Sequence, residues 1–230
     1  MNYKQRLKHW LGVVFGATVV YQTESFAQEG EDVILAKLVE HIPQGFYIDI
    51  GAHHPYRFSN TYLLYKKGWS GINIDPSPGG MSAFQLNRPR DLNLEIGVGK
   101  TEGTLTYYQF ADTALNTFDP TAAQRVQKSG QSALISKKTV PVQSLQSITD
   151  RWVPSPTEVA VLDVDVEGSE LEVLQGNDWE RIRPLVISVE YLSQEPISAV
   201  LESDLAKYLE QYGYELHART VNTVFFKRSR

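Results

Sequence analysis

The chain has 230 residues, of which 42% are hydrophobic and none is cysteine, and its formal net charge is −5 at pH 7. This length suits one well-buried domain and is short for two. The lack of cysteine excludes disulfides, thiolate zinc sites and cysteine nucleophiles. The body of the chain has no strongly basic stretch, which argues against a nucleic-acid partner, because phosphate binding needs clustered lysine and arginine.

The first 23 residues form a basic and apolar segment that we expect to be helical. Lys4, Arg6 and Lys8 precede an apolar stretch from Trp10 to Tyr21. This stretch is shorter than the roughly 18 residues that a membrane-spanning helix needs. Three interpretations are open: a helix packed on the domain, a peripheral membrane contact through residues 1–21, or a cleaved signal sequence. The expected location is the cytoplasm, with membrane association as the alternative.

From residue 45 onward, short β-rich runs alternate with helical patterns, which predicts an α/β fold with helices on both faces of a parallel sheet. The expected strands are Phe46–Ile50, Gly71–Asp75, Asp91–Ile96, Val159–Asp165, Leu185–Glu190, Tyr214–Ala218 and Asn222–Lys227. Only Arg219–Val221 separates the last two strands. They can therefore pair only as a hairpin, which makes the last strand antiparallel to its neighbour.

Two of the expected helices carry recognisable ends. Asn60 or Ser59 can cap a helix through TYLLYKK, and Gly68 can end it in a left-handed conformation. Ser169 can likewise cap ELEVLQ, which Gly176 follows.

One long excursion interrupts the alternation of strands and helices. It runs from LTYYQF through a polar stretch, Ala111 to Lys138, to TVPVQ. We expect a single domain over residues 24–230 with a loop or hairpin insertion around residues 104–142. Excursions of this length are usually functional, and this one is expected to cover the substrate.

Acidic residues stand at the carboxyl ends of the expected strands, where open α/β sheets bind ligands. These residues are Asp49, Asp75, Asp165, Glu167 and Glu190. Asp75 follows Asp49 by 75 − 49 = 26 residues, near the spacing of about 20 between a first-strand turn and the acid that binds ribose hydroxyls. Alternatively, DPSPGG is a turn in which Asp75 bonds its own backbone.

In VLDVDVEGSE, Asp163, Asp165 and Glu167 alternate with apolar residues, so all three face one side if the strand persists. Three neighbouring carboxylates raise some of their pKa values unless a cation compensates. The pattern therefore predicts a positive group nearby, and an oxygen-rich Mg²⁺ or Ca²⁺ site at Asp165 and Glu190 is one form of it. The alternative is a strand that ends at Asp165, with Glu167 at the start of the next helix.

Four segments together resemble the FkbM family of S-adenosylmethionine-dependent methyltransferases: SFAQEGED, YIDIGAHHP, SNTYLLYKKGWSGINIDPSP and DVEGSELEVLQGNDWERIRPLVISVE. The resemblance covers about residues 24–227. It implies a Rossmann-like class I methyltransferase sheet, mostly parallel with an antiparallel last strand. It also implies S-adenosylmethionine as cofactor and O-methylation of a sugar, glycolipid, polysaccharide or related natural product.

The resemblance and the strand ends together give the candidate site residues. The cofactor-binding candidates are Asp49, Gly51, Ala52, His53, Ser59, Asn60, Thr61, Asp75, Pro76, Asp165 and Glu167. A sugar hydroxyl needs a general base or a metal, for which the candidates are Asp165, Glu190 and His54, with Mg²⁺ as a cation for the two acids. The chain departs from the family's more glycine-like turn at His53, His54 and Pro55. His9, His41 and His217 are expected to be structural or exposed.

Two further functions remain open. A nicotinamide-dependent oxidoreductase would have a similar ribose acid, but no GxGxxG follows the first strand. A non-catalytic cofactor-binding domain is the other alternative. The expected partner is a small-molecule or glycan acceptor, whose identity the fold does not specify; the oligomeric state is left open.

Overall fold

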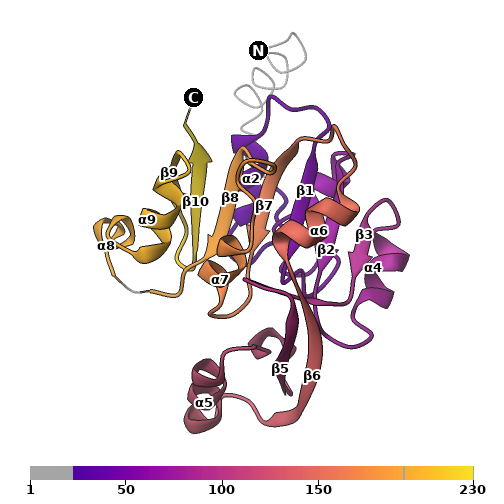
Figure 1. Ribbon diagram of the computed structural model, residues 1–230, viewed down its shortest axis with the longest axis vertical. Coiled ribbons are helices and arrows are strands. Elements are labelled where there is room, and N and C mark those ends of the chain that lie inside the picture. Colours follow the sequence, from indigo (N-terminus) through magenta and orange to yellow (C-terminus); the bar gives the residue numbers. More distant parts are fainter. Residues whose placement is uncertain (1–22, 194, 230) are drawn as a thin grey trace, which may run out of the picture.

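The computed structural model describes residues 23–193 and 195–229. Its main sheet has the strand order β3-β2-β1-β7-β8-β10-β9 (Figure 1). The bounds are β1 Phe46–Ile50, β2 Ser70–Ile74, β3 Leu92–Leu94, β7 Val159–Val164, β8 Val186–Glu190, β9 Tyr214–Arg219 and β10 Thr223–Arg228. Strand β10 is antiparallel to both β8 and β9, and the other pairs are parallel. The predicted α/β fold with an antiparallel last strand is confirmed.

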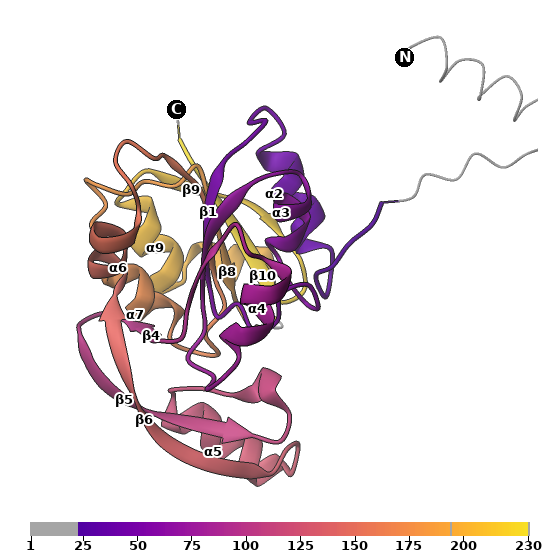
Figure 2. The same cartoon turned by 90° about the vertical axis from the view of Figure 1, so that its right-hand side faces the viewer.

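Helices cover both faces of the main sheet, as Figure 2 shows. On β1, Ile48 faces one apolar cluster and Tyr47 the other, because successive side chains of a strand point to opposite faces. The first cluster includes residues of α6 (Leu145–Trp152), α7 (Glu170–Gln175), α8 (Ile197–Leu201) and α9 (Asp204–Glu210). The second includes residues of α2 (Glu31–Leu38) and α3 (Tyr62–Lys66). A smaller cluster joins Ala52 to α4 (Met81–Asn87).

Helix α3 ends as its sequence predicts, but Thr61, and not Asn60 or Ser59, occupies its cap position and makes no side-chain cap bond. The Ser59 hydroxyl accepts a hydrogen bond from the Tyr62 backbone N–H at 3.1 Å. Gly68 has φ +95, the left-handed conformation that closes a helix without a steric penalty.

Helix α7 differs from the prediction at both ends. Ser169 makes no capping bond with its side chain; instead the Glu170 carboxylate accepts the Gly168 N–H at 2.9 Å. Gly176 has φ −83 and is not a left-handed stop. Glycine is needed at position 176 because of close packing: a Cβ there would lie 2.5 Å from the Gly99 carbonyl oxygen.

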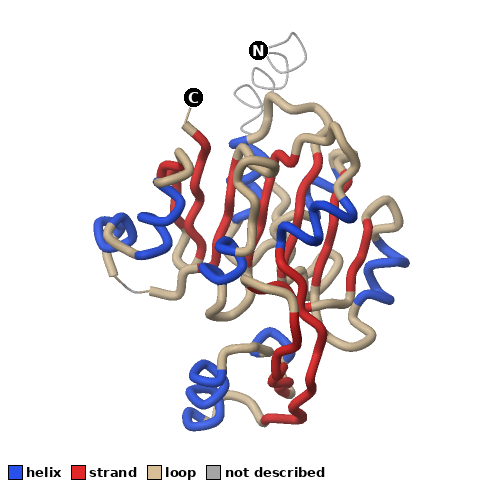
Figure 3. The backbone as a smooth tube through the Cα atoms, viewed as in Figure 1, coloured by secondary structure: helices blue, strands red, loops and turns tan. Residues whose placement is uncertain are grey.

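The insertion belongs to a second sheet, whose strand order is β4-β6-β5. Figure 3 shows two of its strands extending below the main sheet. The strands of this second sheet are β4 Gly97–Gly99, β5 Gly103–Phe110 and β6 Leu134–Ser144. Strands β5 and β6 form the expected antiparallel hairpin, while β4 pairs parallel to β6. The polar stretch between β5 and β6 folds into a 3-10 helix, η1 (Thr113–Leu115), and helix α5 (Pro120–Ser129).

The expected helical segment at the amino end, residues 1–23, lies outside the described residues except for its last residue. The interpretations of that segment, including a membrane contact through residues 1–21, therefore stay predictions. Within the described part of the chain, no helix combines the length and apolar character needed to cross a membrane.

Candidate active site

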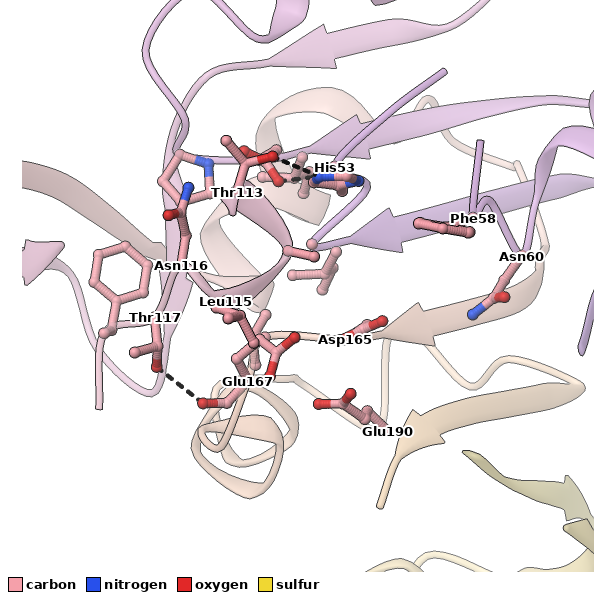
Figure 4. A pocket seen from close by; sticks show the side chains of 18 of the residues that line it. His53, Phe58, Asn60, Thr113, Leu115, Asn116, Thr117, Asp165, Glu167 and Glu190 are labelled. Atoms are coloured by element: carbon pink, nitrogen blue, oxygen red, sulfur yellow. Dashed lines mark hydrogen bonds between the residues drawn. The ribbon is translucent and has the colours of Figure 1, made fainter. Parts of the chain in front are cut away.

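A cavity of about 400 Å³ lies at the carboxyl ends of the parallel strands, next to η1 (Figure 4). The predicted site residues that line it are Gly51, His53, Asn60, Asp75, Pro76, Asp165, Glu167 and Glu190. They come from the ends of β1, β2, β7 and β8 and from the turn before α3. The parallel sheet thus brings residues that are far apart in sequence to one edge.

The other predicted site residues, Asp49, Ala52, His54, Ser59 and Thr61, do not line this cavity. Asp49 is buried and accepts a hydrogen bond from the Thr61 hydroxyl. The His54 Nδ1 accepts the Arg57 backbone N–H at 3.1 Å, so this imidazole holds its own turn. The direct contact of these five residues with a ligand stays a prediction.

Of the remaining histidines, His41 and His217 are exposed, as expected. His9 lies outside the described residues.

Asp75 bonds the backbone of its own turn, as one of the two alternatives predicted, and its role in binding ribose stays a prediction. Its Oδ1 accepts the Ser77 N–H at 2.7 Å, and its Oδ2 accepts the His53 N–H at 3.1 Å. The side chain also lines the cavity, although the residue is only 6% exposed. Each carboxylate oxygen has a second lone pair. Asp75 can therefore order two turns and still accept hydrogen bonds from two hydroxyls of a ligand.

Three carboxylates meet on the other side of the cavity floor. Asp165, Glu167 and Glu190 point toward one another in Figure 4, and one oxygen of each lies within 4.8 Å of the others. Each is partly exposed, and all three line the cavity.

Enclosure by protein changes the acidity of all three groups. Burial raises the pKa of Asp165 well above its ordinary value, and the neighbouring Glu167 and Glu170 add to the rise. Burial followed by the Asp165 charge raises the pKa of Glu190 to about 11. Burial, with Glu170 next, raises the pKa of Glu167 to about 7. The cluster therefore holds protons at neutral pH unless a cation replaces them.

Asp163 does not join this cluster, because β7 ends at Val164 and the alternation ends with it. Its buried carboxylate accepts from the Ser188 hydroxyl and from the Asn60 Nδ2, the latter at 3.2 and 3.3 Å to its two oxygens. The condition for three acids on one face, a strand that continues to Glu167, is therefore not met, and the strand ends close to the alternative end at Asp165. The bonds of Asp163 fix the Asn60 amide, which lines the cavity.

A buried arginine, Arg88, connects the elements around the turn that follows β1. Arg88 is fully buried at the end of α4, and its Nε donates to Asp91 at 2.9 Å. Its Nη2 donates to the Tyr47 hydroxyl at 2.6 Å and to the Thr61 hydroxyl at 2.9 Å. Asp49 lies 3.9 Å from its Nη1. This network links the first strand, the start of α3 and the end of α4.

Unfavourable backbone conformations cluster at the cavity. Within the described residues, the non-glycine residues with positive φ are His53 (+51), Phe58 (+59) and Glu167 (+56). All three line the cavity. Such conformations cost about 1–3 kcal/mol each and are typical of functional sites, where the surrounding structure enforces them.

The insertion closes over the cavity and is bonded to both sides of it. The Thr113 hydroxyl lies 3.0 Å from the His53 Nε2, and the Thr117 hydroxyl donates to the Glu167 carbonyl oxygen at 2.9 Å. Sequence reasoning placed a substrate cover here but identified none of its lining residues. The insertion supplies Tyr107, Thr113, Ala114, Leu115, Asn116, Thr117, Phe118 and Gln131 to the wall. No periodic pattern marks them.

The methyltransferase FkbM domain model matches residues 49–216, which include every strand from which the cavity acids come. The chain belongs to the FkbM methyltransferase family. This membership agrees with the strand order and with the antiparallel last strand of this FkbM domain.

Solved structures show more distant similarity. A TehB-like S-adenosylmethionine-dependent methyltransferase from Corynebacterium glutamicum is 12% identical over 98% of this chain and 97% of its own, with a TM-score of 0.40. Precorrin-6y C5,15-methyltransferase from Geobacter metallireducens is 9% identical over 90% and 92%, with a TM-score of 0.39. No curated protein sequence matches this chain.

Proposed function

We propose that this FkbM methyltransferase transfers a methyl group from S-adenosylmethionine to a hydroxyl of a sugar, glycolipid, polysaccharide or related natural product. The observation that carries the proposal is the convergence of Asp75, Asp165 and Glu190 from three strands on one cavity. Family membership supports methyl transfer. The proposal goes beyond family membership in two respects, namely that an oxygen atom accepts the methyl group and that the acceptor belongs to the chemical classes named above.

The residues present suit the cofactor. A volume of about 400 Å³ falls within the usual range of small-molecule sites. Asp75 would hold the ribose hydroxyls, and the carboxylates of Asp165, Glu167 and Glu190 would attract positive charge. When bound, S-adenosylmethionine supplies an electrophilic methyl group on a cationic sulfur. Few glycines are needed around it, because this cofactor has no pyrophosphate that requires a cradle of backbone amides.

Asp165 and Glu190 are the pair best placed to accept the acceptor's proton. Burial raises the pKa of both groups, and the Asp165 charge raises that of Glu190 further, whereas the hydrogen bond with Glu190 lowers the pKa of Asp165. Glu190 therefore keeps its proton more readily than Asp165 does. A raised pKa makes the ionised oxygen a stronger base toward a hydroxyl within hydrogen-bond reach. His54, the third candidate, lies outside the cavity lining, and its Nδ1 is used within its own turn.

A divalent cation is a separate part of the proposal. The three carboxylates offer the oxygen ligands that Mg²⁺ prefers, and Mg²⁺ there would neutralise the cluster and acidify a bound hydroxyl. Methyl transfer should then stop on exhaustive chelation and return with added Mg²⁺. Full activity in the chelator would remove the cation from the mechanism and leave Asp165 and Glu190 as the base.

The cofactor assignment is tested by calorimetry with S-adenosylmethionine and the Asp75→Asn variant. Asn keeps the size of the side chain but lacks one acceptor oxygen, so we expect binding at least about tenfold weaker. Asp150→Asn is the matched control, because Asp150 pairs with Arg181 on the surface of α6. Unchanged affinity of Asp75→Asn would remove Asp75 from the ribose role.

Family membership argues against one of the two rival functions, whereas the other has to be separated by experiment. Membership of a methyltransferase family favours methyl transfer over nicotinamide-dependent oxidation. A non-catalytic cofactor-binding domain would bind S-adenosylmethionine yet methylate no sugar, lipid or phenol. A screen of such acceptors, read by transfer of a labelled methyl group, separates it from the enzyme.

A further inference from the structure

The cavity has a fifth carboxylate that the strand ends do not supply. Glu31, the first residue of α2, lines the cavity and is only 3% exposed. It does not belong to the cluster of Asp165, Glu167 and Glu190. Gln28, Asn222 and Thr223 line the same wall.

This wall is far from the predicted ribose site. Asp75 follows β2, whereas Thr223 begins β10, and β1, β7 and β8 lie between these two strands. Four steps of about 4.8 Å separate them by roughly 19 Å. A ribose held at Asp75 therefore cannot also contact Glu31, which meets whatever occupies the opposite end of the cavity.

Glu31 contacts Thr223, which lies opposite Glu190, one of the two proposed general bases. Its Oε1 lies 3.5 Å from the Thr223 hydroxyl, and Thr223 is the register partner of Glu190 across β10 and β8. Its Oε2 accepts the Glu29 backbone N–H at 2.8 Å. Each oxygen retains a free lone pair. The carboxylate can thus accept hydrogen bonds from ligand hydroxyls beside Glu190.

The wall is fixed in place on both sides. Fully buried Asp32 accepts from the Ser25 hydroxyl and the Phe26 N–H, each at 2.7 Å. The Glu29 carboxylate accepts from the backbone N–H and the Nδ2 of Asn222 at 3.0 and 2.8 Å. This bidentate contact joins the segment before α2 to the β9–β10 turn. Glu31 is therefore held on a rigid support.

We propose that Glu31 is the acceptor-specificity residue of this enzyme. It accepts hydrogen bonds from hydroxyls next to the one that is methylated, and so places the reacting hydroxyl at Glu190. This inference rests on the proposed function. It requires an acceptor that carries at least two neighbouring hydroxyls, because one faces Glu31 while the other faces Glu190.

The test uses the full chain saturated with S-adenosylhomocysteine and four probes, the methyl glycosides of glucose, mannose, galactose and rhamnose. Glycoside binding is measured by ligand-observed NMR titration, and S-adenosylhomocysteine affinity by calorimetry. We expect wild-type protein to bind at least one glycoside. Glu31→Gln should weaken that binding about tenfold or more and leave the affinity for S-adenosylhomocysteine within about twofold.

Glu24→Gln is the matched control, because it makes the same charge change on the same segment at an exposed pair with Lys66. Thr223→Val is a second variant that keeps shape and charge, and it should weaken glycoside binding less than Glu31→Gln. The proposal would be overturned if Glu31→Gln lost affinity for S-adenosylhomocysteine as much as for the glycoside. It would also be overturned if Glu31→Gln bound the glycoside as tightly as wild-type protein does, or if wild-type protein bound none of the four glycosides. Failure of the proposed function would instead appear as absent cofactor binding by wild-type protein.

Discussion

Glu167 shows how one residue at the cavity carries both backbone and electrostatic strain. It has φ +56, and burial with nearby Glu170 raises its pKa from an ordinary 4.5 to about 7. An acid whose pKa is higher in the folded state makes folding less favourable once it ionises. Between pH 4.5 and about 7 the unfolded chain has lost this proton and the folded protein has kept it.

The contribution of Glu167 to the free energy of unfolding should therefore fall as pH rises through this window, and Glu190, whose pKa is raised to about 11, should extend the fall to higher pH. We expect ligand-free protein in a chelator to melt a few degrees lower at about pH 8 than at about pH 5.5, since ~1 kcal/mol shifts the melting temperature of a protein of this size by about 2–4 °C. Calorimetric melting across pH measures it. Glu167→Gln removes this titration and should make the slope shallower; a melting temperature that rises toward pH 8 would contradict the prediction.

Arg88 illustrates the cost of removing a buried charge. Arg88→Met leaves Asp91 without its ion-pair partner and removes donors from Tyr47 and Thr61. We expect a loss of about 3–5 kcal/mol in the free energy of unfolding, because an uncompensated charge stays buried. Urea unfolding measures this loss.

The matched control for this variant is Lys66→Met. Lys66 pairs with Glu24 at 2.6 Å on the surface, so its removal should change stability by less than about 1 kcal/mol. Equal effects of the two variants would show that Arg88 does not stabilise the turn in the way described.

At the scale of elements, the insertion is held over the cavity by two threonine hydroxyls. Thr113→Val with Thr117→Val removes the contacts to His53 and to the Glu167 carbonyl with almost no change of shape. If closure of this segment retains the cofactor, the double variant should bind S-adenosylhomocysteine about 5–10-fold more weakly, mainly through faster release. Stopped-flow binding measures both rates.

Thr121→Val is the control for this double variant, because Thr121 lies on α5 and is exposed. An unchanged release rate in the double variant would mean that the segment is a fixed wall and does not cover the bound cofactor.

The elements that sequence predicted well are those with a strong local signal. Alternation and buried apolar runs gave the seven strands of the main sheet to within a few residues, and the short link at Arg219–Val221 fixed the hairpin. Strand β4 was not predicted from the sequence, because Gly97–Gly99 has little β-propensity and pairs only with β6, which is distant in the chain. Ser169 makes no side-chain cap bond, and Glu170 bonds the amides of Val166 and Gly168 that precede the helix.

The same distinction applies to the site. The strand-end acids were predictable because a parallel sheet places all its carboxyl ends at one edge. The residues of the cavity walls could not be predicted in this way, since Thr113, Thr117 and Glu31 reach the cavity only through tertiary contacts. Whether Asp163 joins the other acids could not be decided from the sequence, because the end of a strand, which decides where an alternating residue points, is the least certain feature of a sequence-based prediction.

At the scale of the whole molecule, the cavity concentrates negative charge from several elements. S-adenosylmethionine carries a positive sulfur that its demethylated product lacks, so the product should bind more weakly, by about tenfold or ~1.4 kcal/mol. Calorimetry with both compounds gives the ratio. Asp165→Asn should reduce the ratio of the two affinities, and Asp150→Asn, on the outer surface, should not. Equal affinity for both compounds in wild-type protein would contradict an attraction between the acids and the sulfonium.

The contact between Glu29 and Asn222 joins residues that are 193 positions apart in the chain. During synthesis on the ribosome, the amino-terminal half emerges and begins to fold well before β10 exists. The wall that carries Glu31 lacks its partners until residues 222 and 223 have been added. A polypeptide that stops before the last hairpin therefore leaves Glu29 without Asn222 and Glu31 without Thr223, so this wall of the cavity can be completed only when translation is nearly finished.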